Sequence, residues 1–345
     1  MKYTDIQIHK TEFDNNFLLL YNNKTLLVGF IVKEILEHLQ QGINSIDEIS
    51  EKIYVKHNLT IDNNCISITK EKIDIFFTKK NKDSFTRIFK LLNPTNLNLK
   101  FLEFLFSNKV FYLFLLITLL LNIYFAFILN NKLLNSIETL IWFFCFLFIL
   151  FLHEIGHSVS AQKFNINSKE IGIGIYLIFP VFYINLGESW KLEKSKRIII
   201  NLSGIYFQLI IGVGLTILNY FFENKIIENL FFTNFLVILL NLNPFIKFDG
   251  YWILSDIMNV KNLSKKSNNV IQKFFILNFD FDKNNFWINV YSFFKFFFLI
   301  FILIYVIKLF LGITSKILTN NPLSVYDYLF SIIFIIVIIK KIQKK

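Results

Sequence analysis

Cysteine is scarce in this sequence, since the 345 residues include only Cys65 and Cys145. Two cysteines so far apart exclude a disulfide framework, and no paired cysteine motif for zinc is present. The amino-terminal stretch is polar and lacks an apolar core, so we expect no cleaved secretory signal. An arginine-rich recognition helix is also missing, which argues against a nucleic-acid partner despite the net charge of +11.

Apolar residues, by contrast, make up 54% of the chain, including 44 phenylalanines, and they cluster after residue 109. A soluble protein this apolar would expose large aggregating patches. We therefore predict an α-helical polytopic membrane protein, with the lipid bilayer as a partner and a small α+β domain at the N-terminus. The predicted division is a soluble domain over 1–85, a linker over 86–109 and a membrane domain over 110–345.

The N-terminal segment has the pattern of a β-hairpin followed by three short helices. Two apolar strands flank residues 22–24, and helical spacing then continues to a stop at Gly42. Ser45 to Glu48 fits a capping box that opens the second helix. This order of elements resembles the small winged-helix domains that bind leader peptides of ribosomally made, modified peptides. The resemblance implies a leader peptide as partner, and contact with another protein is the alternative.

Six apolar segments after residue 109 are candidates for membrane spans, which need about 20 residues each. Lys295 and Lys308 interrupt the fifth segment, where they could snorkel or face protein. Asp327 lies within the sixth. The six segments are Val110–Asn131, Thr139–Leu152, Ile198–Phe222, Asn229–Ile246, Trp287–Ile313 and Leu323–Ile339.

Lysine and arginine are distributed unequally over the connections between these segments. The region before the first span, the loops over 163–197 and 247–283, and the C-terminal end are rich in basic residues. With six spans, all four regions fall on one side, and the positive-inside rule makes that side cytoplasmic. The expected localisation is an integral, multi-pass protein of a bacterial cell membrane with both termini in the cytoplasm.

The second apolar segment runs directly into His153-Glu154-Ile155-Gly156-His157, an H-E-x-x-H motif. Residues four apart lie on one helical face, so His153 and His157 can bind one zinc ion. Glu154 is then placed to take a proton from water, whose pKa zinc lowers to about 7. The alternative is a set of polar residues at a helix end near the headgroups, but such residues are costly unless functional.

A catalytic zinc takes three protein ligands and keeps one open position. No histidine follows His157, so the third ligand in the membrane domain is expected to be a carboxylate, with Cys145 a weaker option. Asp249 is the best candidate because it follows the fourth span, on the same side as His157, and Asp256 is the fallback. Pro244 breaks the helix, and we expect the glycine after Asp249 to allow an unusual backbone conformation. A turn-capping role for Asp249 is the alternative.

The pairing of H-E-x-x-H with Asn241-x-x-Pro244-x-x-x-x-Asp249-Gly250 resembles the site-2 protease family of intramembrane zinc metalloproteases. The resemblance covers residues 110–260 and implies His153, His157 and Asp249 as ligands and Glu154 as general base. Ile246 and Phe248 depart from the family, which often has proline and leucine there, and no segment is long enough for a PDZ domain. Asp249-Gly250-Tyr251-Trp252 resembles the branch named peptide zinc metalloproteases.

Three further side chains are predicted to bind substrate: Gln208, Asn241 and Asn243. Gly204 to Gln208 also resembles the peptide branch, and Gln208 could hydrogen-bond a substrate backbone or serve only as a helix-packing contact. The apolar stretch 171–187 contains two early glycines and Pro180, and the resemblance implies strands there beside the active site. A strand edge could pair with an unwound substrate, whereas a membrane-surface loop is the alternative.

These observations predict zinc-dependent endoproteolysis of a peptide or membrane-associated protein, at or within the cytoplasmic half of the bilayer. The resemblance implies a role in maturation or export of a secreted modified peptide. Two alternatives stay open: regulated intramembrane cleavage of a signalling protein, and a non-catalytic transport or immunity protein that retains the metal site.

Overall fold

The computed structural model describes residues 2–12, 16–21, 24–78, 85–97, 99–130, 132–166, 168, 170–176, 179–275, 286–319 and 322. The chain divides into two compact units, which are described in turn. The first unit comprises Met1–Gly174 and Phe182–Leu239, and the second comprises Ile175–Val181 and Leu240–Lys345.

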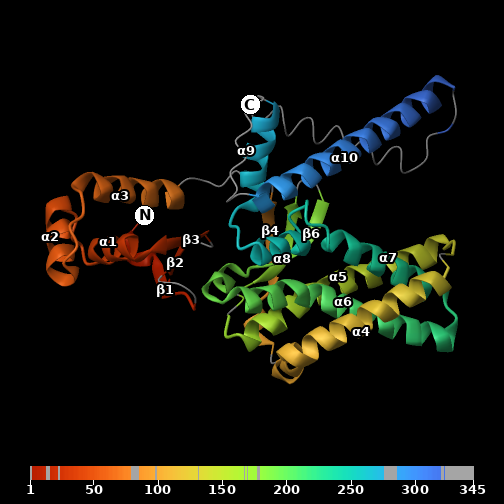
Figure 1. Ribbon diagram of the computed structural model, residues 1–345. Coiled ribbons are helices and arrows are strands. Elements are labelled where there is room, and N and C mark those ends of the chain that lie inside the picture. The colour runs from red at the N-terminus through yellow and green to blue at the C-terminus, as the bar shows by residue number, and fades with distance from the viewer. Residues whose placement is uncertain are drawn as a thin grey trace. The chain divides into compact units, whose positions relative to one another are not determined.

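The N-terminal part of the first unit is a three-stranded antiparallel sheet followed by three helices (Figure 1). The predicted hairpin is confirmed, because β2 pairs with β3 in the register Tyr21↔Lys24. The predicted end of the first helix at Gly42 is confirmed, because the helix ends at Gln40 and Gly42 has a left-handed φ of 86°. The elements are η1 (Tyr3–Asp5), β1 (Gln7–Lys10), β2 (Asn16–Tyr21), β3 (Lys24–Gly29), α1 (Phe30–Gln40), α2 (Ile46–His57) and α3 (Asn63–Thr78).

Two local features of this domain differ from the sequence predictions. The first strand, β1, was not predicted, because Ile8 is the single apolar residue among its four and gives no apolar pattern. Ser45 is the N-cap of α2, but its side chain makes no capping hydrogen bond, so the predicted capping box is wrong. The winged-helix likeness itself stays a prediction.

Four helices are long and apolar enough to cross a membrane, within the part of the chain that the structure describes. Many of their large apolar side chains are exposed to the surroundings, as expected for helices that face lipid. They match the first, second, third and fifth predicted spans. The four segments are Val110–Ile128 in α4 (Asn108–Ile128), Ser136–Lys163 (α5), Lys194–Phe222 (α6) and Phe286–Lys316 in α10 (Phe286–Leu318).

The fourth predicted span is not confirmed as a crossing. Its helix, α7 (Lys225–Asn241), has 17 residues and ends at Asn241, so it is about 26 Å long, shorter than the roughly 30 Å hydrocarbon core. The chain leaves the helix there because Pro244 follows, and proline cannot continue a helical ladder. The sixth predicted span, Leu323–Ile339, lies outside the described residues.

The segment predicted as a linker over 86–109 contains regular structure. Strand β4 (Phe85–Leu92) joins the hairpin of β5 (Ile171–Tyr176) and β6 (Phe179–Ile184) in a second three-stranded sheet. A Cβ at Gly172 would lie 2.5 Å from the carbonyl oxygen of Phe89, so glycine allows β4 to approach β5 closely. Short turns follow, at η2 (Pro94–Asn96) and η3 (Lys100–Phe106), and η4 (Gly187–Lys191) leads from β6 to α6.

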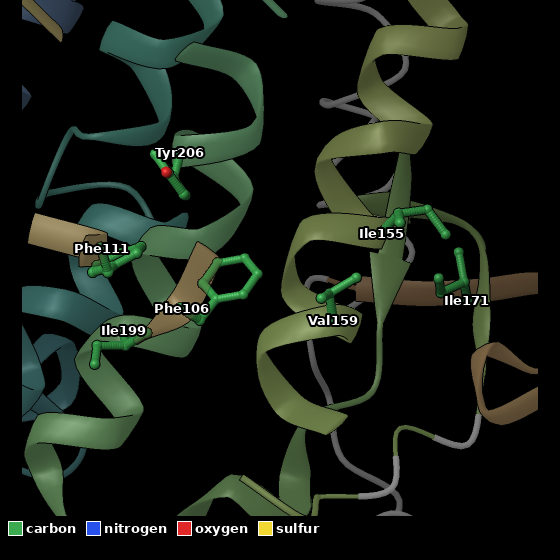
Figure 2. Packing of buried hydrophobic residues seen from close by; sticks show 7 residues of the cluster. All are labelled: Phe106, Phe111, Ile155, Val159, Ile171, Ile199 and Tyr206. Atoms are coloured by element: carbon green, nitrogen blue, oxygen red, sulfur yellow. The ribbon is translucent and has the colours of Figure 1, made fainter. Parts of the chain in front are cut away.

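A buried aromatic and aliphatic cluster holds α4, α5, α6 and this sheet together (Figure 2). Phe106 of η3 is fully buried, and its ring stands 5.9 Å from that of Tyr206, edge to face. Ile155 and Val159 reach the same cluster from α5, four residues apart on one face. The histidines of the H-E-x-x-H motif therefore lie on another face of a helix whose rotation this cluster fixes.

The second unit is built from α8 (Asp249–Ile257), α9 (Leu263–Phe275) and α10 around Tyr251 and Tyr291. Lys295 is only 5% exposed within α10, and its Nζ donates to the Ser264 hydroxyl at 3.0 Å and to Asn268 Oδ1 at 2.8 Å. Of the two alternatives for Lys295, snorkelling or facing protein, the structure shows the second.

A buried carboxylate lies at the centre of the N-terminal helices. Glu34 of α1 is 1% exposed, and Lys33, Lys56 and His57 lie 2.7, 2.9 and 3.0 Å from its oxygens. Burial raises the pKa of the Glu34 carboxyl, but hydrogen bonds from these three groups lower it by more, to about 2. The charged form of Glu34 therefore stabilises the contact between α1 and α2.

Because the folded pKa of Glu34 lies below its ordinary value, its contribution is complete above about pH 4.5 and is lost as the pH falls towards 2. We expect hydrogen exchange of the α1 and α2 amides to accelerate over this range in the full chain in detergent. In Glu34→Gln the stability is lower at neutral pH and its acid dependence is weaker, and an unchanged acid profile would contradict the assignment.

Candidate zinc centre

Helix α5 carries three of the predicted site residues, His153, Glu154 and His157, near its C-terminal end. The helix begins with a complete capping box, in which the Asn135 side chain accepts from the Glu138 amide and Glu138 accepts from the Asn135 amide. It then continues without a break through the apolar run and the motif to Lys163. The predicted one-turn spacing of the two histidines on a single helix is therefore confirmed.

Both imidazoles are buried and held through their Nδ1 atoms. His153 is 7% exposed and His157 is 4% exposed. His153 Nδ1 lies 2.9 Å from the Gln208 Oε1 atom, and His157 Nδ1 lies 2.7 Å from the Ile200 carbonyl oxygen. Since both partners are acceptors, each Nδ1 carries the proton and each Nε2 keeps its lone pair.

The two Nε2 atoms face each other at a distance of 3.1 Å. Two imidazole lone pairs at this distance repel each other unless a cation lies against both. Two nitrogens bound to one tetrahedral zinc at 2.0–2.1 Å would be separated by about 3.3 Å. The donor chemistry and the spacing of His153 and His157 therefore fit a zinc ion.

One face of α6 provides the surroundings of both rings. Ile200, Gly204 and Gln208 follow one another at four-residue intervals, so they line one side of the helix. Gln208 contacts His153 and Ile200 contacts His157, with Gly204 between them. A Cβ at Gly204 would lie 2.5 Å from His157 Nε2 and 2.7 Å from His153 Nε2. Glycine thus keeps open the space in which the two donor nitrogens converge.

Small residues let α5 and α6 come this close. A Cβ at Gly156 would lie 2.7 Å from the Ser203 carbonyl oxygen, so only glycine is accommodated without a shift. Ser160 donates to the Ser203 hydroxyl at 2.8 Å, which links the two helices at a third point. Close contact of small residues is a usual way for membrane helices to associate.

Glu154 lies next to His153 on α5 and is half-buried. Its position in the motif places it one residue from the first donor imidazole, on a helix whose rotation the surrounding packing fixes. This is the arrangement that the general-base prediction requires.

Asp249 belongs to the second unit, where it is the first residue of α8 and is half-buried. The segment before it forms a tight turn, in which the Phe245 amide donates to Asn243 Oδ1 at 2.9 Å. The Tyr291 hydroxyl of α10 donates to the Pro244 carbonyl at 3.0 Å. The structure thus fixes the backbone that presents Asp249, and its role as third ligand stays a prediction.

The unusual backbone conformation predicted for Gly250 is wrong. Among the described glycines only Gly42 has a positive φ, and Gly250 is part of helix α8. Its small size is needed for another reason, because a Cβ there would lie 2.2 Å from the Leu242 carbonyl oxygen. Glycine therefore allows the start of α8 to lie against the carbonyl groups of Asn241 and Leu242.

The alternative ligands can be compared by helical geometry. Cys145 is exposed and precedes His153 by eight residues on α5, which separates them by about 12 Å along the helix. Cys145 therefore cannot share an ion with this imidazole. Asp256 is 4% exposed and lies seven residues after Asp249 on α8, about 10 Å away, so one ion can take only one of these two carboxylates.

The three residues predicted to bind substrate have different surroundings. Gln208 is fully buried in α6 and contacts His153. Asn241 is half-buried at the last position of α7, and Asn243 caps the turn that follows. Their contact with substrate stays a prediction.

Two known proteins are similar to the chain over a long segment. It is 30% identical over 177 residues to the "Putative peptide zinc metalloprotease protein YydH" of Bacillus subtilis, and the match covers 47% of this chain and 68% of that protein. The chain belongs to this zinc metalloprotease family. It is also 28% identical over 141 residues to "Zinc metalloprotease MJ0392" of Methanocaldococcus jannaschii, covering 39% of this chain and 40% of that protein.

No protein-family model matches the metalloprotease, and no solved structure does. Membership of the family makes zinc the cofactor of this metalloprotease, in agreement with the donor set on α5. The match to the more specific site-2 family stays a resemblance.

Several residues that shape the metalloprotease site had no predicted role. The carbonyl group of Ile200 has no sequence signal, because every residue carries one. Gly156 lies within the H-E-x-x-H motif and Ser203 within an apolar segment. Small residues at such positions mark close helix contacts in membranes. Asn234, which donates to the Gln208 carbonyl at 2.8 Å, is a buried amide in an apolar run, a rare feature that could have been noted.

We expect Gly204→Ala to reduce zinc binding strongly, because its methyl group would occupy the space between the two Nε2 atoms. The matched control is Gly214→Ala in the same helix, where a Cβ meets nothing within 4 Å. The metal content of both purified proteins is measured by mass spectrometry of the metal. Equal zinc content in the two variants would contradict the location of the site.

Proposed function

We propose that the metalloprotease is a zinc-dependent membrane endopeptidase that cleaves a peptide or membrane-associated protein at or within the bilayer. The observation that carries this proposal is the pair of Nε2 atoms at 3.1 Å on a helix apolar enough to cross a membrane. Glu154, the proposed general base, follows the first of these histidines directly in the sequence.

His153, His157 and Asp249 are the proposed ligands. Two imidazoles and one carboxylate form a donor set that catalytic zinc sites use, and they leave one position for water or substrate. The buried acceptors on α6 hold the imidazoles in the tautomer that can bind metal.

Zinc, when bound, supplies Lewis-acid chemistry that acidifies a water molecule and polarises the scissile carbonyl. Glu154 accepts the proton of the attacking water as the carbon–oxygen bond forms. Glu154 then donates this proton to the nitrogen as the carbon–nitrogen bond breaks, so that the amine leaves neutral.

An intact helix resists proteolysis because its carbonyl groups are hydrogen-bonded and covered. The substrate must therefore be extended before cleavage. Strand β6 lies at an edge of the sheet β4–β5–β6, and an edge strand offers unpaired backbone groups to an extended peptide. We propose that this edge binds the unwound substrate, and that Asn241 and Asn243 contact its backbone.

The proposed biological role is maturation or export of a secreted modified peptide in a bacterial cell membrane, with both termini of the protease in the cytoplasm. The name of the Bacillus subtilis relative, a peptide zinc metalloprotease, supports a peptide substrate. The N-terminal sheet supports a leader peptide as partner, because β1 and β3 are its two edge strands.

Regulated cleavage of a signalling protein is the second candidate for the same chemistry. A third candidate is a transport or immunity protein in which the zinc site is not catalytic. Comparing peptides from cells that produce either the wild-type protein or a catalytically inactive variant separates the three. A short secreted peptide that depends on activity would indicate peptide maturation. A cleaved regulator would indicate regulated cleavage. No difference between the two cell types would indicate a non-catalytic protein.

We expect Glu154→Gln to lower the cleavage rate by about 100- to 10,000-fold, because the amide cannot accept the proton. Zinc content should remain at the wild-type level, since no ligand is changed. Glu138→Gln in the same helix is the matched control, because glutamine also completes a capping box. If Glu154→Gln retains zinc and leaves the peptide profile of the cells unchanged, the protease proposal fails.

Asp249→Ala is expected to weaken zinc binding by removing the third ligand, whereas Asp256→Ala should leave the affinity close to that of the wild type. Zinc affinity is measured by competition with a chelator for each detergent-solubilised variant. The opposite ranking would assign the ligand to Asp256 instead, and two wild-type affinities would exclude both carboxylates.

A further inference from the structure

We propose that Gln208 is a positioning residue for the zinc centre, which sets the orientation and tautomer of His153. Gln208 has no exposed surface, and its Oε1 atom lies 2.9 Å from His153 Nδ1. This inference rests on the zinc centre of the proposed function and is independent of whether a peptide is cleaved there.

The amide of Gln208 has only one orientation that is compatible with a metal on His153. With Oε1 towards the ring, Nδ1 carries the proton and Nε2 is free to donate its lone pair. With the NH2 group towards the ring, Nδ1 would have to accept, and the proton would sit on Nε2, which could then bind no metal. The carbonyl oxygen of Gln208 therefore selects the metal-binding tautomer of His153.

Two buried amides from neighbouring helices fix the backbone of α6 at this residue. Asn234 of α7 donates its Nδ2 to the Gln208 carbonyl at 2.8 Å. Asn122 of α4 donates its Nδ2 to the next carbonyl, that of Leu209, at 2.9 Å. Both asparagines are fully buried in apolar helices. Each is therefore costly to place in a membrane segment unless its hydrogen bonds are made.

The result is a chain of contacts that leads from α4 and α7 to the metal ligand. Asn234 and Asn122 hold the carbonyls of Gln208 and of the next residue, Leu209, and the side-chain oxygen of Gln208 holds His153. His157 has a different support, the Ile200 carbonyl, which no substitution of a side chain removes. Ser203 Oγ also lies 3.3 Å from His157 Nδ1, but the Ile200 carbonyl holds this imidazole whatever side chain stands at position 203.

The test measures zinc binding to the full chain in detergent by competition with a chelator. Gln208→Met keeps the length of the side chain and removes the acceptor, so we expect zinc to bind about 10- to 100-fold more weakly. Gln208→Glu restores an acceptor for Nδ1 and should bind zinc at least as tightly as the wild type. Asn234→Leu should show a smaller loss, because it acts through the backbone.

A second readout reports on the geometry of the ligands. With cobalt(II) in place of zinc, the visible absorption of Gln208→Met should differ from that of the wild type, and that of Gln208→Glu should be restored. Thr216→Val is the control for loss of a buried polar group from α6, because the Thr216 hydroxyl donates to the Gly212 carbonyl of its own helix. Its affinity and spectrum should match the wild type.

Wild-type zinc affinity and an unchanged cobalt spectrum in Gln208→Met would overturn the positioning role. If that variant showed instead a raised KM with intact metal binding, Gln208 would contact substrate. His153→Ala separates this outcome from failure of the site itself. If His153→Ala also binds zinc as tightly as the wild type, the proposed ligand set is wrong. If His153→Ala loses zinc affinity while Gln208→Met keeps it, only the role of Gln208 is rejected.

Discussion

The structure of the site depends on two imidazole nitrogens that face each other across 3.1 Å. Nothing within the two rings favours this approach, because both Nε2 atoms carry lone pairs. The approach is imposed from outside by acceptors on α6, which take the Nδ1 protons, and by Gly204, which leaves the space open. Much of the described fold can be understood as the support of this arrangement: small residues where α5 meets α6, an aromatic cluster that fixes helix rotation, and asparagines that bind the α6 backbone.

The surroundings of the site combine two demands that oppose each other. A zinc site needs polar groups, whereas helices that cross a membrane must present apolar surface to lipid. The chain meets both demands by placing phenylalanine and leucine on the outward faces of α4, α5 and α10, while the polar side chains of His153, Gln208 and Asn234 are fully or nearly fully buried. Each of these buried groups makes a hydrogen bond to protein, which lowers the cost of removing it from water.

The sequence was most informative where a short motif has a fixed spacing. H-E-x-x-H predicted two histidines on one face of a helix, and Pro244 predicted the end of α7, because both conclusions follow from local backbone geometry. The sequence was less informative where distant segments meet. Strand β4 lies in a segment predicted as a linker, since its pairing with β5 depends on a partner about 80 residues away. The role of the Ile200 carbonyl could not be predicted from the sequence, because every residue has a backbone carbonyl. The fourth predicted span is not confirmed as a crossing, because the apolar run continues past Asn241, where its helix ends.

The central claim is that His153 and His157 hold zinc through their Nε2 atoms, and X-ray absorption at the zinc edge of the purified full chain tests it most directly. We expect a first shell of nitrogen and oxygen atoms at about 2.0–2.1 Å, with the outer-shell scattering of two imidazole rings. A shell containing sulfur at about 2.3 Å, or a spectrum without imidazole scattering, would contradict it.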